Sequence, residues 1–287
     1  MADHPPEIFD RARRRLRRDR AAPRYAAHDV IHAHMTDEVI GRLDLVSRPF
    51  SDVLDLGGHG GALAARLAGR GMAVTSVDAG ARFAEAAGGV QADEDRPIFA
   101  ARSFDLILSV GVLDQLNDLP GALVLIRQML RPDGLFLGSF IGGGSLPRLR
   151  AAMLAADGDQ AAPRIHPQID VRAAGDLLMR AGFTLPVVDG DRLTVRYRAL
   201  AGLVADLRGM AATNLLRGSP PLGRSAASRA AAAFAAQADA DGRVSETFNI
   251  VHLSGWAPSP DQPQPARRGS ATASLADALR RAPPEGR

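Results

Sequence analysis

The most constraining feature of the chain is a short apolar run that ends on a carboxylate and passes directly into a group of glycines. Residues 53 to 61 are Val-Leu-Asp-Leu-Gly-Gly-His-Gly-Gly. A strand, a glycine-rich turn and a helix in succession hold nucleotide-like ligands at the edge of a parallel sheet. Such glycines let the backbone approach a ligand closely, and the following helix N-terminus offers unpaired amide donors. The loop therefore predicts a ligand site, with tight packing as the alternative interpretation.

The spacing of the glycines disfavours a dinucleotide. The pattern GxGxxG fails because Leu63 stands at its last position when counted from Gly58, and His59 stands at its third when counted from Gly57. Asp55 lies two positions before the first glycine, which suits a ligand that has no pyrophosphate. S-adenosylmethionine (SAM) is the common ligand of that kind.

Two further carboxylates follow in the order that SAM requires. The run at 72 to 77 predicts a second strand that ends on Asp78, 23 residues beyond Asp55. A carboxylate at this place can accept hydrogen bonds from both ribose hydroxyls. Asp93 stands just before a weak third strand predicted at 96 to 99, where it is placed to receive the adenine amino group.

The next two strands complete the order. Residues 104 to 110 predict a buried fourth strand that contains Ser109. The sequence Leu-Arg-Pro-Asp-Gly at 130 to 134 closes a helix and leads into a fifth strand at 135 to 141.

In this order the segments DLGGHGG, SVD, ADEDRPIFAARSFDLILS and LRPDGLFLGSF resemble the class I SAM-dependent methyltransferases. The resemblance implies an α/β, Rossmann-like fold: a seven-stranded, mostly parallel sheet with helices on both faces, N-terminal helices, and a helical insertion before the last strand. It also implies SAM as the cofactor and no metal. The residues expected to hold SAM are Asp55, Gly57, Gly58, Gly60, Asp78, Asp93 and Ser109.

A narrower resemblance covers nearly the whole chain. The segments IFDRARRRLRRDRAA, GGGSLPRLR, APRIHPQIDVRAAGDLLMRAGF, VVDGDRLTVRYRAL, DLRGMAATN and RRGSATASLADAL are similar to the methyltransferase-like assembly factors of respiratory complex I and their alphaproteobacterial homologues. This resemblance implies a protein substrate, with a complex I subunit as the candidate partner. The eukaryotic member of that family is a mitochondrial matrix protein that hydroxylates an arginine.

Two departures from the family pattern leave the activity open between three alternatives. His59 replaces the middle glycine of the loop, and Asp114-Gln115 stands where the family carries a His-Trp pair. The leading hypothesis is a SAM-dependent methyltransferase. The alternatives are a protein-arginine hydroxylase on the same scaffold and a non-catalytic, SAM-binding assembly chaperone.

Methyl transfer requires mainly that the donor and the acceptor be held in line and that water be excluded, so no catalytic triad is expected. Asp114, His166 and Tyr197 are the catalytic candidates, and Arg164, Arg208 and Asn214 are further acceptor-side candidates. A carboxylate such as Asp114 or Asp189 could bind a guanidinium group bidentately. A turn cap for His166 and a core position for Tyr197 are the structural alternatives.

Composition excludes several classes of protein. The chain has no cysteine, which excludes disulfides and thiol nucleophiles, and no apolar run reaches the length of a membrane span. With 46% apolar and 23% charged residues it predicts one elaborated globular domain. The N-terminus lacks the apolar segment of a secretory signal, so we expect a cytoplasmic protein, and the absence of lysine suggests a GC-rich bacterial genome.

All 35 basic residues are arginines, and seven of them lie between Arg11 and Arg20. Ile8, Ala12 and Leu16 recur there at helical spacing, which predicts a basic amphipathic helix. Such a helix could lie on anionic lipid at the inner membrane or dock an acidic partner, or it could pack its apolar stripe on the core. Nucleic-acid binding is disfavoured because the segment has one nearby aromatic and no recognition motif.

The remaining segments predict the domain organisation. Residues 1–47 form the basic and amphipathic helices, 48–256 the methyltransferase domain with a helical lid at about 199–240, and 257–287 a Pro- and Arg-rich tail. Residues 26 to 46 predict a helix on which His28, His32 and His34 could bind a metal. Since no carboxylate cluster adjoins them in the sequence, we expect a polar helix face instead. Oligomeric state is not predicted.

Overall fold

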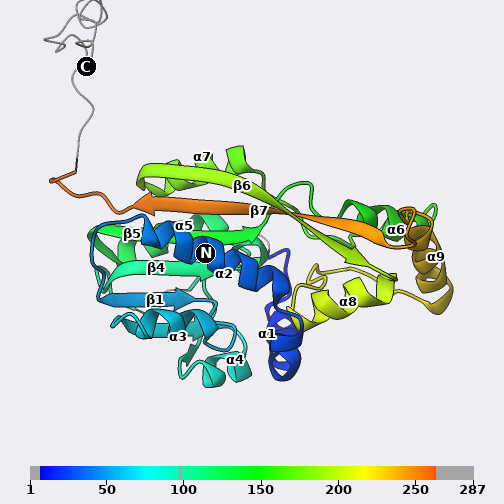
Figure 1. The fold of residues 1–287 in the computed structure, drawn as a ribbon, viewed down its shortest axis with the longest axis horizontal. Helices are drawn as coiled ribbons and strands as arrows, with labels where there is room; N and C mark the ends of the chain where they lie inside the picture. The colour runs from blue at the N-terminus through cyan, green and yellow to red at the C-terminus, as the bar shows by residue number, and fades with distance from the viewer. Residues whose placement is uncertain (1–6, 97–98, 263–287) are drawn as a thin grey trace, which may run out of the picture.

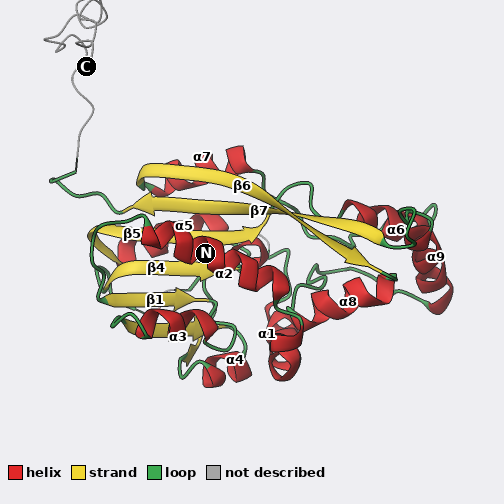
Figure 2. Cartoon of the chain, in the orientation of Figure 1, coloured by secondary structure: helices red, strands yellow, loops and turns green. Residues whose placement is uncertain are grey.

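The computed structural model describes residues 7–96 and 99–262, which build a seven-stranded sheet with helices on both faces (Figures 1 and 2). The strand order is β3-β2-β1-β4-β5-β7-β6, and only the pairings of β7 with β5 and β6 are antiparallel. The strands are β1 (Asp52–Leu56), β2 (Ala73–Asp78), β3 (Val90–Gln91), β4 (Phe104–Val110), β5 (Leu130–Ile141), β6 (Thr184–Tyr197) and β7 (Val244–Trp256). The expected Rossmann-like, mostly parallel fold is confirmed.

The helices divide between the two faces of the sheet and a lobe at one end. They are α1 (Arg11–Ala21), α2 (Val30–Asp44), α3 (Ala62–Ala68), α4 (Ala81–Ala86), α5 (Leu119–Met129), α6 (Pro147–Asp157), α7 (Val171–Ala181), α8 (Leu200–Gly209) and α9 (Arg224–Ala235), with 3₁₀ turns η1 (Ala22–Ala27) and η2 (Leu113–Gln115). None of the helices in the described residues has the length and apolarity that crossing a membrane requires.

Successive side chains of the central strands are buried on opposite faces of the sheet, which produces two cores. Val53 and Leu106 are paired across β1 and β4 and pack with α2 and α3, whereas Leu54 and Ile107 point the other way and pack with α5 and α7. Helices cover both faces because a parallel sheet buries both of its sides. The carboxyl ends of β1, β2 and β4 thereby meet at one edge.

The antiparallel pair of β6 and β7 projects beyond the parallel strands and carries α6, α8 and α9 as a separate lobe (Figure 1). The helices α8 and α9 lie between these strands in sequence, within the region for which a lid is predicted. The sequence predicts two strands here, at 183–188 and 193–197, but the structure has the single strand β6, because Asp189-Gly190-Asp191 stays paired with β7. The third strand is Val90–Gln91, whereas the predicted one at 96–99 includes residues 97–98, which lie outside the described range. The sequence also predicts a short helix at 274–281 in the tail, and these residues lie outside the described range as well.

The apolar stripe predicted for α1 does not pack on the core. Ile8 and Leu16 are 43% and 48% exposed, while the long side chains of Arg14 and Arg18 are buried. The interpretation of α1 as a helix with an apolar inner face was therefore wrong. Its inner face is made of arginines, because these side chains pair with buried carboxylates at the edge of the sheet.

Candidate functional site

The glycine-rich loop between β1 and α3 has the backbone that its sequence predicts. Gly57, Gly60 and Gly61 have φ values of 95°, 99° and 87°, which only glycine adopts without strain. The amides of Gly57 and Gly58 donate to the carbonyl of Val77 at 2.8 and 3.0 Å, which fixes the loop against the end of β2. The loop thus brings backbone to the carboxyl edge of the sheet, where a ligand of this fold is held.

His59 fills the space that the loop encloses. Its Nε2–H donates to the carbonyl of Val110 at 2.8 Å, so its Nδ1 is the acceptor that faces Arg18 Nη2 at 3.2 Å. Its ring stacks on Tyr25 with centroids 5.3 Å apart and packs against His32 at 4.5 Å. Burial and the charge of Arg18 hold the pKa of His59 well below its usual value, so the ring is neutral.

Asp78 lies at the end of β2, as predicted, but its carboxylate is fully engaged within the chain. Arg18 Nε donates to its Oδ1 at 2.7 Å, and a second nitrogen of Arg18 pairs with Oδ2. The backbone amides of Gly80 and His59 donate to the same carboxylate at 2.7 and 3.1 Å. Both side chains of the Arg18–Asp78 pair are fully buried.

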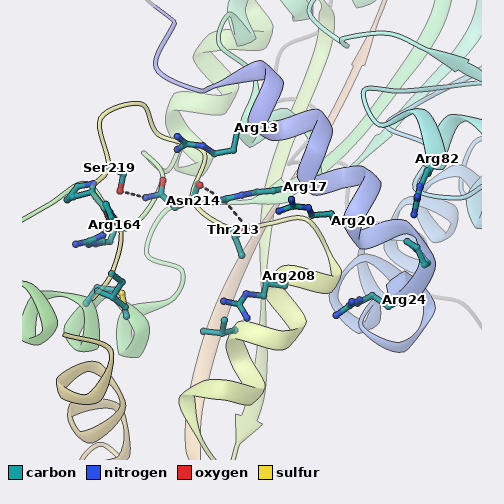
Figure 3. Close-up of a pocket in the computed structure, with 16 residues that line it drawn as sticks. Arg13, Arg17, Arg20, Arg24, Arg82, Arg164, Arg208, Thr213, Asn214 and Ser219 are labelled. Carbon is teal, nitrogen blue, oxygen red and sulfur yellow. Dashed lines mark hydrogen bonds between the residues drawn. The ribbon is translucent and has the colours of Figure 1, made fainter. Parts of the chain in front are cut away.

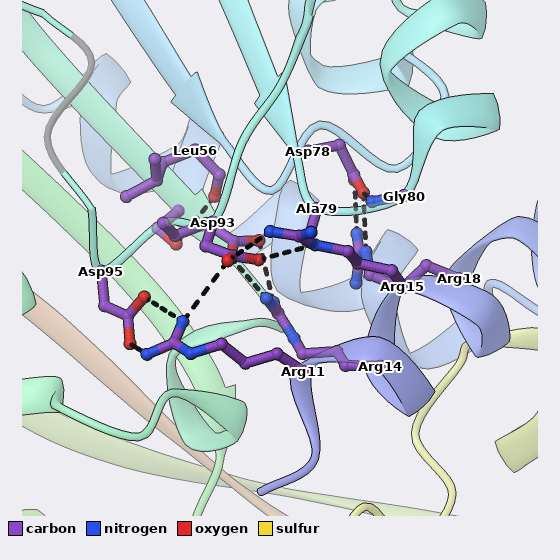
Figure 4. A network of polar contacts seen from close by, with 12 residues as sticks. Arg11, Arg14, Arg15, Arg18, Leu56, Asp78, Ala79, Gly80, Asp93 and Asp95 are labelled. Atoms are coloured by element: carbon purple, nitrogen blue, oxygen red, sulfur yellow. Dashed lines mark hydrogen bonds and ion pairs between the residues drawn. The ribbon is translucent and has the colours of Figure 1, made fainter. Parts of the chain in front are cut away.

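Three more arginines of α1 pair with the acidic residues that follow β3 (Figure 4). Arg14 pairs with buried Glu94 at 2.8 Å, and the other pairs are Arg15–Asp93 at 2.6 Å and Arg11–Asp95 at 2.6 Å. Asp93 is therefore at the expected edge but faces a guanidinium. Four arginines at helical spacing, 11, 14, 15 and 18, join one face of α1 to this edge.

The remaining predicted cofactor residues are buried around the same loop. Asp55 is 1% exposed, and burial together with the charge of Asp78 raises its pKa to about 7. Ser109 Oγ donates to the carbonyl of Leu56 at 2.9 Å. Beside Asp55 and Tyr25 a cavity of only ≈20 Å³ remains, which is room for about one water molecule.

These residues fit SAM by type but not by space. Carboxylates at the ends of β1 and β2 and a glycine loop between them supply the groups that an adenosine and an amino acid moiety require. A Cβ on Gly80 would come within 2.7 Å of the Cβ of Arg18, so α1 lies directly against the turn after β2. In this conformation α1, Tyr25 and His59 occupy the place of the cofactor, and we call this closed region the cofactor edge.

On its other side α1 borders a large open cavity, which we call the arginine mouth (Figure 3). It measures ≈1100 Å³, and Thr213, Asn214 and Ser219 lie among its lining residues. Its walls also carry seven arginines, namely Arg13, Arg17, Arg20, Arg24, Arg82, Arg164 and Arg208.

A second cavity of ≈480 Å³, the apolar chamber, adjoins the arginine mouth, since Val204, Arg208 and Leu222 line both. Its walls are mostly aliphatic, and they come from β5, α6, α8, α9 and the loop before α7. The volume lies within the roughly 300–1,000 Å³ typical of small-molecule sites. Together the arginine mouth and the apolar chamber form one two-part cavity.

Two of the three predicted catalytic residues line the apolar chamber. Asp114 Oδ1 is shielded from solvent and has no hydrogen-bond partner among the described residues, and burial raises its pKa to about 7. His166 Nε2 accepts from the amide of Leu215 at 2.8 Å, and burial and Arg17 lower its pKa to about 4. His166 therefore ties the chamber wall together as a neutral ring, while Asp114 is left with a free oxygen.

Of the other acceptor-side candidates, some line the two-part cavity and others lie away from it. Tyr197 packs in the core beside α8 and lines neither part of the cavity. Arg164, Arg208 and Asn214 line both parts, and Arg164 is paired with Asp157 at 2.7 Å. Asp189, the other carboxylate considered for a guanidinium, pairs with Arg42 at 2.6 Å on the α2 side of β6.

The three histidines near α2 point to three different places. His32 packs against His59, and His28 contacts Asp206 at 2.8 Å. Of the three, His34 belongs to a cluster of possible metal ligands, because it lies with Glu38 and Asp191 such that one ligand atom of each is within 4.8 Å of the others. Arg42 already pairs with Glu38 at 2.7 Å, and the group lines neither part of the cavity.

Sequence reasoning missed the arginine mouth and the closure by Tyr25. The arginines at 13, 17, 20 and 24 are spaced by four, three and four residues, which was a readable signal for a second basic face. Arg82 and Arg208 come from distant segments, and nothing local indicates that they meet α1.

Comparisons with known proteins agree with this geometry. Residues 4–186 match the model of a methyltransferase domain family. The chain is 33% identical to the arginine-hydroxylase NDUFAF5 of Danio rerio, over 94% of this chain and 89% of that one. It is 31% identical to the malonyl-[acyl-carrier protein] O-methyltransferase of Laribacter hongkongensis, over 87% and 90%.

A solved structure shares the fold at low identity. The YcgJ protein of Bacillus subtilis superposes with a TM-score of 0.54 and 14% identity, covering 79% of this chain and 99% of that one. The matched family model spans more than half of the chain, and the two curated relatives span most of it. The chain therefore belongs to the class I methyltransferase family, whose cofactor is S-adenosylmethionine.

Proposed function

We propose that this protein is a SAM-dependent methyltransferase that acts on a protein substrate during assembly of respiratory complex I. One observation carries the proposal. The free oxygen of Asp114 lies in a cavity of ligand size, directly after the strand that carries Ser109. Burial raises the pKa of Asp114 to about 7 against the opposing charges of Arg14 and Arg18, and the residue lines the apolar chamber.

In this proposal α1 holds the cofactor edge closed and must shift before SAM enters. Arg18 satisfies the carboxylate of Asp78, which would otherwise accept from a ribose, and the stacked rings of Tyr25 and His59 fill the adjoining space. The role of the chain's own residues is then to position and desolvate: Asp78 and Asp55 orient the cofactor, and Asp114 contacts the acceptor.

Binding of SAM tests the cofactor part of the proposal. We expect SAM to raise the melting temperature of the protein, more in His59→Gly than in the wild type because the ring no longer fills the loop. Asp78→Asn should abolish the shift. The matched control is Asp176→Asn, an exposed carboxylate on α7 far from the site, which should respond like the wild type. If neither the wild type nor His59→Gly responds to millimolar SAM, the proposal fails.

The substrate part needs mass analysis. Complex I subunits isolated with and without the protein should differ by a methyl group on the modified chain. An added oxygen would instead assign the hydroxylase activity that names the NDUFAF5 relatives. If Asp78→Asn and Asp114→Asn fully restore complex I assembly in a deletion strain, the protein acts as a non-catalytic chaperone.

A further inference from the structure

The positive charge of the arginine mouth is largely uncompensated. Among the described residues no carboxylate forms an ion pair with the guanidinium group of Arg20, Arg24, Arg82 or Arg208, whereas Arg13 pairs with Asp10 and Arg164 with Asp157. Arg17 donates to the hydroxyl of Thr213 at 2.8 Å and has no acidic partner there. Burial and the neighbouring charges of Arg13 and Arg208 lower the pKa of Arg17. Like charges are therefore held together at a cost that a bound anion would relieve.

The floor of this charged cavity is apolar. Val204, Leu222 and Met153 line both the arginine mouth and the apolar chamber, so the two parts are continuous at these side chains. Ala227 and Ala231 on α9 add small side chains to the chamber wall. A ligand that spans both parts must carry an anionic end and an apolar end.

We propose that the two-part cavity binds a phosphate ester joined to an apolar chain, with the phosphate among the arginines of the mouth and the chain in the apolar chamber. Guanidinium groups bind phosphate oxygens in pairs of parallel hydrogen bonds, which suits a mouth built only from arginine cations. The chamber excludes a purely polar ligand, because burying polar groups beside aliphatic walls without partners is costly. The site lies apart from the cofactor edge, so its occupation does not require that SAM bind, and it includes the chamber in which the proposed function places contact between Asp114 and the acceptor.

Calorimetric titration with dodecyl phosphate, below its micelle-forming concentration, tests the proposal. Dodecyl phosphate should bind more tightly than inorganic phosphate and more tightly than the uncharged dodecyl maltoside. The double variant Arg20→Ala/Arg208→Ala should weaken its binding by about tenfold or more, since each charge-assisted hydrogen bond is worth roughly that factor. Arg180→Ala, an exposed arginine on α7, is the control and should leave binding unchanged.

The apolar end is tested separately. Ala227→Phe should weaken dodecyl phosphate while leaving inorganic phosphate unchanged, because it fills the chamber and not the mouth. Leu222→Ser, at an exposed junction residue, repeats this test without adding bulk. Equal binding of dodecyl phosphate by the double arginine variant, or by both chamber variants, would overturn the proposal, as would tighter binding of an acidic peptide.

Two sources could supply this chemistry, a lysophospholipid and an acyl chain on phosphopantetheine. Titration with lysophosphatidic acid and with S-dodecanoyl phosphopantetheine distinguishes them. The probe with the lower dissociation constant identifies the source. Equal affinities support the shared chemistry alone. The SAM melting shift measured on the same variants shows whether a failure concerns this site or the proposed function.

Discussion

The cofactor edge and the arginine mouth lie on opposite sides of one helix and treat charge in opposite ways. Arg18 and Arg14 face the edge, where each is buried against a carboxylate. Arg17 and Arg20 face the mouth, where the neighbours are other arginines. The helix therefore contributes to stability through one face and to ligand recognition through the other. The ion pairs of α1 close the cofactor edge, whereas its arginines without carboxylate partners among the described residues leave the mouth able to bind an anion.

The sharpest test of this contrast removes one arginine from each face. Arg18→Ala leaves the carboxylate of Asp78 buried without its counter-ion, and we expect a loss of about 3–5 kcal/mol in the free energy of unfolding. Arg20→Ala removes an exposed side chain with no carboxylate partner and should change it by less than about 0.5 kcal/mol. Urea denaturation measures both. Similar losses for the two variants would contradict the division of α1 into two faces.

Acid should weaken the cofactor edge through His59. Its pKa is lowered in the folded state, so its stabilising contribution is complete above the unfolded pKa of about 6.5 and is lost as the pH falls below it. Between pH 7.5 and 5.0 we expect the wild type to lose up to about 2 kcal/mol relative to His59→Asn. Urea midpoints of both proteins at the two pH values give the difference, in which contributions from other groups cancel. A parallel decline of the two proteins would refute the buried, neutral ring.

Asp114 in the apolar chamber should make stability change with pH in the opposite direction, so that the protein is less stable at high pH. The folded pKa of Asp114 is raised to about 7 from an ordinary value near 3.8, so its contribution is present at low pH and lost as the pH rises through this window. Asp114→Asn should therefore gain stability over the wild type between pH 5 and 8, by about 1 kcal/mol after allowance for its partial exposure. Thermal unfolding at the two pH values checks this. If the variant gains nothing at pH 8, Asp114 is solvated and not held in the chamber.

The smallest expected effect concerns repulsion in the arginine mouth. Arg208→Glu places an anion beside Arg17, and we expect it to raise the free energy of unfolding by about 0.5 kcal/mol at low salt. The gain should vanish in 1 M NaCl, where charges are screened beyond about 3 Å. Denaturation at both salt concentrations measures it, with Arg180→Glu on α7 as the control. Destabilisation at low salt would mean that the mouth already contains compensating charge.

Local patterns predicted the central sheet and its ligand loop well. The buried strand β4 and the amphipathic helix α7 follow directly from the sequence, because β4 is a short, mostly apolar run and the burial of α7 repeats with the period of a helix. The short β3 could not be predicted, since Val90 and Gln91 are both exposed and form no apolar run. The continuity of β6 across Asp189-Gly190-Asp191 depends on pairing with β7, which lies far along the chain.

In the candidate site, too, the features set by local sequence could be predicted and those set by distant contacts could not. Asp55 and Asp78 could be placed from spacing, because strand ends in a parallel sheet meet at one edge. The pairing of Asp78 with Arg18 could not be predicted, since the two residues are 60 positions apart and no local rule joins them. The predicted role of Asp114 rests on its place after β4, and the two-part cavity that gives it a context is assembled from five separate segments of the chain.

The short bridge between Phe9 and Leu216 gives the molecule a mechanical property. Phe9 also packs its ring on His166 at 4.8 Å, so the start of the chain, the connection after α8 and the segment before α7 are fastened at one point. Any movement that lifts α1 from the carboxylates must also pull on the chamber wall. Occupation of one compartment is then energetically linked to access to the other, and by reciprocity each occupant would alter the affinity for its counterpart by the same factor.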